Sequence, residues 1–207
     1  LHENVAEIDF VSMYPFIMAK FNISPETLNC PCCHNHIVPE IGYSICAQHK
    51  GLIPESLEPL VAKRIRYKLG ANELPAGSRQ DIYRQRAQSI KGLLVTCFGY
   101  TGYKNARFGK IEAHEAITAY GRAVLLQAKE IVEDHGFEVL HLIGAHVEVI
   151  QSDNGFAEFC LRIDFQGFGG ELLFGRCDEG VDLLLVGFPF LIGRVKQDRC
   201  AIKAAAK

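Results

Sequence analysis

The sequence contains no run of 18 or more apolar residues, so we expect no membrane-spanning helix. Its N-terminus has neither a basic segment nor a long apolar one, so we expect no secretory signal peptide. An initiating methionine is absent, which predicts a fragment of a longer chain. No internal repeat is present. What remains is 207 residues with 48% hydrophobic and 22% charged content, typical of a globular protein with one compact core or two small lobes.

Net charge is small, at −2, but unevenly distributed. Residues 63–110 contain 11 of the 22 Lys and Arg residues but only two acidic ones, Glu73 and Asp81. This stretch therefore carries +9 and the remainder of the chain carries −11. A basic stretch inside an otherwise acidic chain fits contact with a polyanion, either nucleic acid or a triphosphate. The alternative is a solvated helix face.

Hydrophobic periodicity predicts a mixed α+β fold. A short strand over residues 5–10 precedes a helical turn over 15–20 and a Pro-, Cys- and His-rich insert over 22–51. One helix begins at Pro54, and residues 70–72 and 75–78 are expected to break it. A second helix follows over 79–97, and the two together predict an antiparallel hairpin. The clearest helix covers 112–135, and a strand over 137–143 follows it. Beyond residue 151 only short strand candidates remain, the best over 181–186.

Half of the eight cysteines lie within the insert, next to three histidines. Cys30 and Cys33, then twelve residues, then Cys46 and His49 give Cys-x2-Cys and Cys-x2-His pairs, a spacing typical of tetrahedral structural zinc sites. Cys32, His34 and His36 are spare ligand candidates. An insert with almost no apolar core gains order from a metal, which favours a structural role. The alternative is reduced thiols in a loop, and either case predicts a reducing compartment, the cytoplasm.

A carboxylate at the end of the first strand precedes a tight turn, in the order Asp-Phe-Val-Ser-Met-Tyr-Pro over residues 9–15. Nucleotidyl transfer needs two divalent ions, about 3.5–4 Å apart, held by carboxylates of neighbouring strands. Hard oxygen ligands suit Mg²⁺, so Asp9 can supply one ligand and the carbonyl of Phe10 a neutral one. The alternative for a lone Asp at a strand end is a cap or turn residue.

These residues resemble the first catalytic motif of family B DNA polymerases, Asp-x-x-Ser-Leu-Tyr-Pro. Residues 91–103 are similar to the fingers motif Lys-x3-Asn-x2-Tyr-Gly, with Val95 and Phe98 in place of the usual Asn and Tyr. That run also resembles the archaeal second-paralogue branch of the family, some members of which have damaged catalytic sites. The similarity extends from Leu1 to Ile143, nearly vanishes over residues 144–192, and resumes faintly at residues 194–199.

The resemblance implies a polymerase palm with an antiparallel sheet and packed helices, a two-helix fingers hairpin and a small zinc-type insert. It divides the chain into the first part of the palm (1–21), the insert (22–53), the fingers hairpin (54–98) and the second part of the palm (99–207), with 144–207 the least similar. Asp9 would be catalytic and bind Mg²⁺, and Tyr14 would be the steric gate against the ribose 2′-hydroxyl. The residues implied to bind the nucleotide are Phe10, Ser12, Met13, Tyr14, Arg84, Arg86, Lys91, Phe98 and Gly99.

The third motif of the family departs from its pattern in this chain. Residues 136–143, Gly-Phe-Glu-Val-Leu-His-Leu-Ile, match the strand that leads to it, but Ala145 then stands where the metal-binding Asp belongs. An alanine has no side-chain ligand atom, so the second metal loses its bridge and the site is reduced to one ion. We therefore expect an inactive or weakly active enzyme.

Side chains alternate along a strand, and counting from Ala145 places Glu148 on the face away from Asp9. A bulge at Gly144 would reverse this register. An active enzyme would then depend on Glu148 or Asp153 as the replacement carboxylate.

The resemblance implies template-directed nucleotidyl transfer from deoxynucleoside triphosphates to a DNA primer, with Mg²⁺ or Mn²⁺ as cofactor and structural Zn²⁺ in the insert. The resemblance also implies replication proteins as partners, and it implies no association with a membrane. A second function is a non-catalytic nucleic-acid-binding module that keeps the polymerase scaffold, for which Asp9→Ala changes nothing measurable. A third possibility is a structural remnant that binds no ligand. A lack of salt-dependent DNA binding by the intact protein would favour this possibility.

Overall fold

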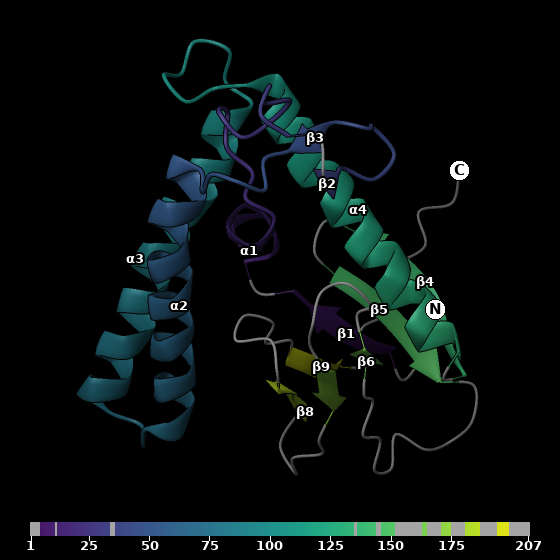
Figure 1. The fold of residues 1–207 in the computed structure, drawn as a ribbon. Helices are drawn as coiled ribbons and strands as arrows, with labels where there is room; N and C mark the ends of the chain where they lie inside the picture. Colours follow the sequence, from purple (N-terminus) through teal and green to yellow (C-terminus); the bar gives the residue numbers. More distant parts are fainter. Residues whose placement is uncertain are drawn as a thin grey trace, which may run out of the picture. The chain divides into compact units, whose positions relative to one another are not determined.

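The computed structural model describes residues 5–10, 12–33, 36–134, 136–143, 146–151, 163–164, 171–174, 181–186 and 194–198, with the backbone alone up to residue 9 and from residue 143. The chain divides into two compact units, one with residues 1–11 and 124–207 and one with residues 12–123. Helices and an antiparallel sheet are both present, as an α+β fold predicts (Figure 1). Within the described residues, none of the helices combines the length and the apolar character needed to cross a bilayer.

The first unit is built on an antiparallel sheet whose strand order is β4-β5-β1-β9-β8-β7-β6. Its strands are β1 (Val5–Asp9), β4 (Phe137–Ile143), β5 (His146–Gln151), β6 (Ile163–Asp164), β7 (Glu171–Phe174), β8 (Val181–Val186) and β9 (Arg194–Asp198). The predicted strands over 5–10, 137–143 and 181–186 are thus confirmed to within a residue. β1 pairs with β5 on one side and with β9 on the other, so the strand that carries Asp9 is internal to the sheet.

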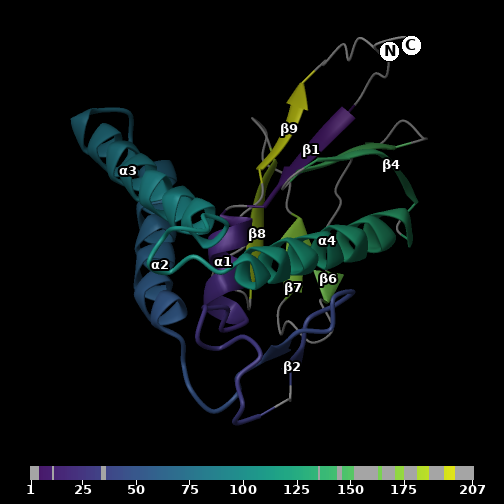
Figure 2. The ribbon, with the colours of Figure 1, turned by 90° about the horizontal axis from the view of Figure 1, so that it is seen from above.

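The second unit contains α1 (Met13–Lys20), α2 (Leu52–Glu73), α3 (Ser78–Thr101) and the first half of α4 (Ile111–Asp134). Helices α2 and α3 lie side by side as an antiparallel hairpin, and α1 contacts both (Figures 1 and 2). Leu57, Val61 and Ile65 form the buried stripe of α2, each at most 6% exposed. The predicted hairpin is confirmed.

Helix α2 does not break at residues 70–72, contrary to the prediction, but continues to Glu73. A Cβ atom at Gly70 would lie 2.8 Å from Cε1 of Tyr83, so the glycine allows the Tyr83 ring of α3 to pack directly on the α2 backbone. Tyr83 also packs edge-on against Tyr67, at 5.4 Å between ring centroids. Gly70 therefore serves helix packing rather than helix termination.

The insert between α1 and α2 contains a small antiparallel pair, β2 (His36–Ile37) and β3 (Ser44–Ile45). Ile23, Leu28, Val38 and Ile45 are each at most 2% exposed, so the expectation of an insert with almost no apolar core is wrong. Leu28 also forms an isolated bridge with Ile45. The insert is therefore ordered by apolar packing as well as by its cysteines.

Candidate functional site

The predicted catalytic residue, Asp9, is the last residue of β1. The register pairs Asp9 with His146 and Glu7 with Glu148. Residues directly opposite each other in an antiparallel pair share a face of the sheet, so the position of Glu148 lies on the face of Asp9. The prediction that it lies on the opposite face is wrong, because β5 pairs with β1 in a register that sets His146 opposite Asp9 and Glu148 opposite Glu7.

The third-motif residues themselves, Gly144 and Ala145, lie outside the described residues, as does Asp153. The described part of the β4–β5 ladder contains an irregularity between Val139 and His141. On its other side β1 pairs Glu7 with Lys196 of β9, so a basic position adjoins this acidic face.

The turn that begins the second unit has a strained backbone. Ser12 precedes α1 with φ 58° and ψ 38°, a left-handed conformation uncommon for a residue other than glycine. Its carbonyl accepts the N–H of Phe16 at 2.9 Å, and its hydroxyl accepts a hydrogen bond from Arg64 of α2. Met13 beside it is buried, as is Phe10. Such a strained conformation persists where neighbouring residues stabilise it, and here the hydrogen bond from Arg64 of α2 stabilises Ser12.

Two residues of the predicted nucleotide site, far apart in sequence, come together in this unit. The ring of Tyr14 in α1 stacks on Phe98 in α3, with 4.4 Å between centroids and 24° between planes. Both side chains are partly exposed. The structure thus joins the first predicted motif to the fingers motif.

The remaining predicted nucleotide-binding residues lie along α3. Arg84, Lys91 and Phe98 recur every seven residues, which places them in one stripe along the helix. Arg84, Lys91 and Gly99 are exposed. Arg86 instead lies over the Tyr67 ring, 5.5 Å from its centroid, and so contributes to the packing of α3 on α2.

The cysteine cluster consists of Cys30, Cys32, Cys33 and Cys46, whose sulfur atoms all lie within 4.8 Å of one another. The separations are 3.3 Å from Cys30 to Cys32, 3.5 Å from Cys30 to Cys33, 3.9 Å from Cys32 to Cys33, 3.5 Å from Cys32 to Cys46 and 3.7 Å from Cys33 to Cys46. A tetrahedron with zinc–sulfur bonds of about 2.3 Å has edges of about 3.8 Å. The four thiols therefore have the geometry of a tetrahedral metal site.

The fourth place in the cysteine cluster is taken by Cys32, a spare candidate in the sequence, and His49 is not part of the group. The backbone N–H of His49 donates to the Cys46 sulfur at 3.4 Å and lowers the pKa of that thiol to about 6. The hydrogen bond between Cys32 and Cys30 raises the pKa of Cys32 to about 12. A second backbone donor, the N–H of Ala47, reaches the Cys33 sulfur at 3.3 Å. The backbone thus favours the thiolate of Cys46, the form that binds a metal.

The paired Cys-x2-Cys and Cys-x2-His spacing favours His49 in the sequence, whereas in the structure the adjacent Cys32 takes that place. Of the other spare candidates, His36 is exposed in β2, and His34 lies outside the described residues.

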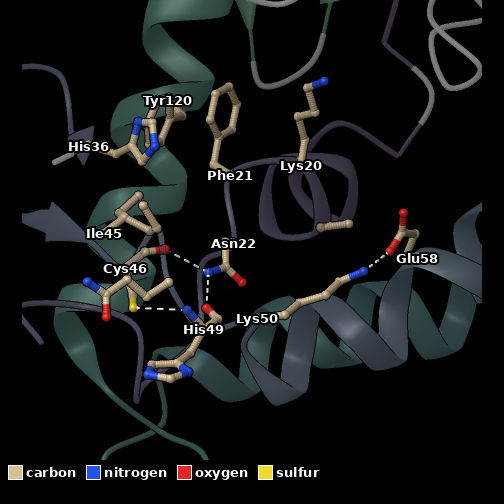
Figure 3. A pocket seen from close by; sticks show the side chains of 13 residues that line it. Lys20, Phe21, Asn22, His36, Ile45, Cys46, His49, Lys50, Glu58 and Tyr120 are labelled. Atoms are coloured by element: carbon tan, nitrogen blue, oxygen red, sulfur yellow. Dashed lines mark hydrogen bonds and ion pairs between the residues drawn. The ribbon is translucent and has the colours of Figure 1, made fainter. Parts of the chain in front are cut away.

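A pocket of about 630 Å³ lies beside the cysteine cluster (Figure 3). Phe21 and Tyr120 stack in its wall at 4.0 Å with 10° between planes. Asn22 donates through its side-chain amide to the carbonyls of Cys46 at 2.9 Å and His49 at 2.7 Å. Asn22 therefore ties the end of α1 to the cysteine cluster. Among the residues that the structure describes, the predicted nucleotide-binding positions do not line this pocket.

Comparison with known proteins identifies the class to which these features belong. The model of DNA polymerase family B matches residues 1–159, well over half of the chain. The chain therefore belongs to DNA polymerase family B, and the predicted family is confirmed.

The similar proteins are archaeal. DNA polymerase 2 of Saccharolobus solfataricus is 40% identical over 153 residues, which cover 74% of this chain and 22% of that protein. DNA polymerase 1 of Pyrococcus abyssi is 32% identical over 188 residues, which cover 81% of this chain and 24% of that protein. A solved family B DNA polymerase from Pyrobaculum calidifontis matches 95% of this chain and 27% of its own, with a TM-score of 0.63 and 26% identity. The chain thus spans about a quarter of the length of these relatives.

Proposed function

We propose that this chain supplies the palm and fingers of an archaeal-type family B DNA polymerase. It would bind a DNA primer-template and a deoxynucleoside triphosphate for template-directed nucleotidyl transfer. The observation that carries the proposal is the stacking of Tyr14 on Phe98, which unites the two motifs expected to hold the incoming nucleotide. In this proposal residues 1–21 and 99–207 form the palm, 22–53 the insert and 54–98 the fingers.

Each part of the proposed nucleotide site has a distinct role. Tyr14 lies under the sugar, and Phe98 and Gly99 adjoin the nascent base pair. Lys91 faces the triphosphate as a point charge, and Arg84, two turns earlier on the same stripe, adds to that field. The remaining contacts are assigned to Phe10, Ser12, Met13 and Arg86.

The metal ligands are incomplete for a two-ion site. Asp9 fits one Mg²⁺ or Mn²⁺ ion, but Ala145 supplies no side-chain oxygen for a bridge to a second. When two ions are bound in such enzymes, they activate the attacking hydroxyl and neutralise the leaving group. Losing an electrostatic element of this kind costs roughly 10²–10³ in rate. We therefore propose a catalytically impaired polymerase.

A second candidate function is a non-catalytic nucleic-acid-binding module that retains the polymerase scaffold. Ala145 and the +9 charge of residues 63–110 together favour it, since binding needs the charge but not the second carboxylate. Replication proteins are a further class of partner in either case.

The cysteine cluster is proposed to hold one structural Zn²⁺, with Cys30, Cys32, Cys33 and Cys46 as ligands. The sulfur separations support this ligand set, and the backbone donors to Cys33 and Cys46 would orient the thiolates. Free thiols suit a reducing, cytoplasmic compartment.

Primer extension by the longest form of the protein, with Mg²⁺ and separately with Mn²⁺, tests the impaired site. Asp9→Asn and Glu148→Gln are the test variants, and Glu138→Gln on the neighbouring strand β4 is the matched control. We expect at most weak extension, lost in Asp9→Asn and unchanged in the control. Because Glu148 shares the sheet face of Asp9, rapid extension that both test variants abolish would show that Glu148 replaces the missing carboxylate. That result would contradict the proposed impairment.

A further inference from the structure

A third ring extends the stack of Tyr14 on Phe98. His114 of α4 stacks on Phe98 with 4.6 Å between ring centroids and 21° between planes. Two flat rings cannot share one face of a third at such distances, so Phe98 lies between Tyr14 and His114. We call Tyr14, Phe98 and His114 the three-ring stack; it joins α1, α3 and α4.

Helix α4 supports both ends of the three-ring stack. His114 forms one end, and a Cβ atom at Gly121 would lie 3.0 Å from Cε1 of Tyr14 at the other. The two residues are seven apart, which places them on one face of α4 and about 10 Å apart along its axis. This separation is close to the combined spacing of three stacked rings. Tyr14 therefore contacts Phe98 and packs closely on the α4 backbone at Gly121.

His114 is itself fixed in place by the end of α3. A Cβ atom at Gly102 would lie 3.0 Å from Nδ1 of His114, so the glycine allows close packing of the ring. The Thr101 hydroxyl donates to the Phe98 carbonyl at 2.7 Å and lies 3.3 Å from the same Nδ1 atom. Thr101 thus connects the His114 ring to the backbone of Phe98. Because Phe98 also stacks on Tyr14, a shift of the His114 ring would move Phe98 and, with it, the Tyr14 ring.

We propose that His114 is a positioning residue that sets the height of the Tyr14 ring through Phe98, and thereby the discrimination between deoxyribose and ribose in the incoming nucleotide. The inference rests on the proposed function, in which Tyr14 lies under the sugar. A side chain that contacts neither sugar nor triphosphate would then control which sugar is accepted. The decisive property is the flat ring of His114, since its stacking holds Phe98 in place.

The test uses binding rather than turnover, so that it does not depend on catalytic competence. The full protein is bound to a primer-template whose primer ends in a dideoxynucleotide, and the apparent Kd is measured for the matched deoxy- and ribonucleoside triphosphates. His114→Ala removes the ring, and His114→Phe keeps a ring without Nδ1. His36→Ala, at an exposed histidine outside the three-ring stack, is the control, and Tyr14→Ala gives the full effect of removing the gate.

We expect the ribose-to-deoxyribose ratio of Kd values to fall roughly 2- to 10-fold in His114→Ala, the size of one lost aromatic pair. His114→Phe and His36→Ala should keep the original ratio. A merely structural role for His114 would weaken the binding of both nucleotides equally and leave the ratio unchanged, which would overturn the inference. A ratio that falls in Tyr14→Ala but not in His114→Ala would overturn it while sparing the proposed function. Absence of template-dependent triphosphate binding by the unsubstituted protein would overturn both.

Discussion

The N-cap residue before helix α2 is a glycine, Gly51, so the helix has no capping side chain of its own. Residues from the insert replace it: Glu26 accepts the N–H of Leu52 at 2.6 Å, and Ser24 accepts the N–H of Ile53 at 3.4 Å. Burial of Glu26 raises its pKa, but the hydrogen bonds from Leu52, Ser24 and its own backbone N–H, together with the charge of Lys110, outweigh burial, so the pKa lies below its usual value. Single side chains of the insert thus satisfy the first turn of a helix that lies outside it.

We predict that Glu26→Gln lowers the stability at neutral pH by roughly 0.5 kcal/mol, or about 1–2 °C in Tm, because it removes a negative charge from a helix N-terminus. A carboxylate whose pKa is lowered by folding stabilises the protein above its unfolded pKa, and this contribution is lost as the pH falls through the folded value. The Tm values of the two proteins, measured by circular dichroism, should therefore converge as the pH falls below about 4. Glu73→Gln at the other end of α2 is the control, and a Tm difference for Glu26→Gln that persists in acid would contradict the prediction.

Among the elements, the insert provides the clearest test of the metal site. We predict one Zn²⁺ per chain by elemental analysis, retained in His49→Ala and lost or strongly weakened in Cys32→Ser, because Cys32 completes the cluster among the residues that the structure describes. Metal binding stabilises the folded state. Where the free zinc concentration is about 100-fold above the Kd of the site, removing the metal with a chelator should lower the Tm by about 5–10 °C.

Cys97→Ser is the control for this zinc measurement, since that cysteine lies in α3 outside the cluster. Zinc retained in Cys32→Ser but lost in His49→Ala would restore the Cys-x2-Cys and Cys-x2-His ligand set that the sequence spacing favours.

The helical elements were predictable because their signals are local. The periodic apolar stripes of α2 and α4 predict both helices, and the turn residues 75–78 predict the boundary between α2 and α3. The break expected at Gly70 fails because its reason is tertiary: Tyr83 of α3 needs the space. The same holds for Glu148, whose sheet face depends on the pairing of β5 with β1, and for His114, whose partner Phe98 lies on another helix. In each case the deciding contact is remote in sequence.

For the whole molecule, the separation of charge has a measurable consequence. We predict that DNA affinity falls steeply between about 50 and 200 mM salt, because cationic side chains release counterions from the phosphates. Arg84→Ala and Lys91→Ala should each lower the slope of log K against log salt by about one. The measurement is fluorescence anisotropy with a labelled primer-template.

Lys129→Ala is the control for this salt dependence, because Lys129 lies in α4 outside residues 63–110 and pairs with Glu133 at 2.6 Å. A salt slope that neither Arg84→Ala nor Lys91→Ala changes would show that the basic stretch is a solvated surface rather than a DNA contact.

The base of the insert is closed by its own first and last residues. Asn22, with φ 57°, accepts the N–H of Gly51 at 2.7 Å through its side-chain oxygen, directly before α2 begins. A loop pinned at its neck in this way can change length without displacing the helices that it joins, since the entropic cost of a longer loop rises slowly. The two ends of the segment between Asn22 and Gly51 are therefore held together independently of its length, and we expect extra residues inserted within it to leave the ends of α1 and α2 in place.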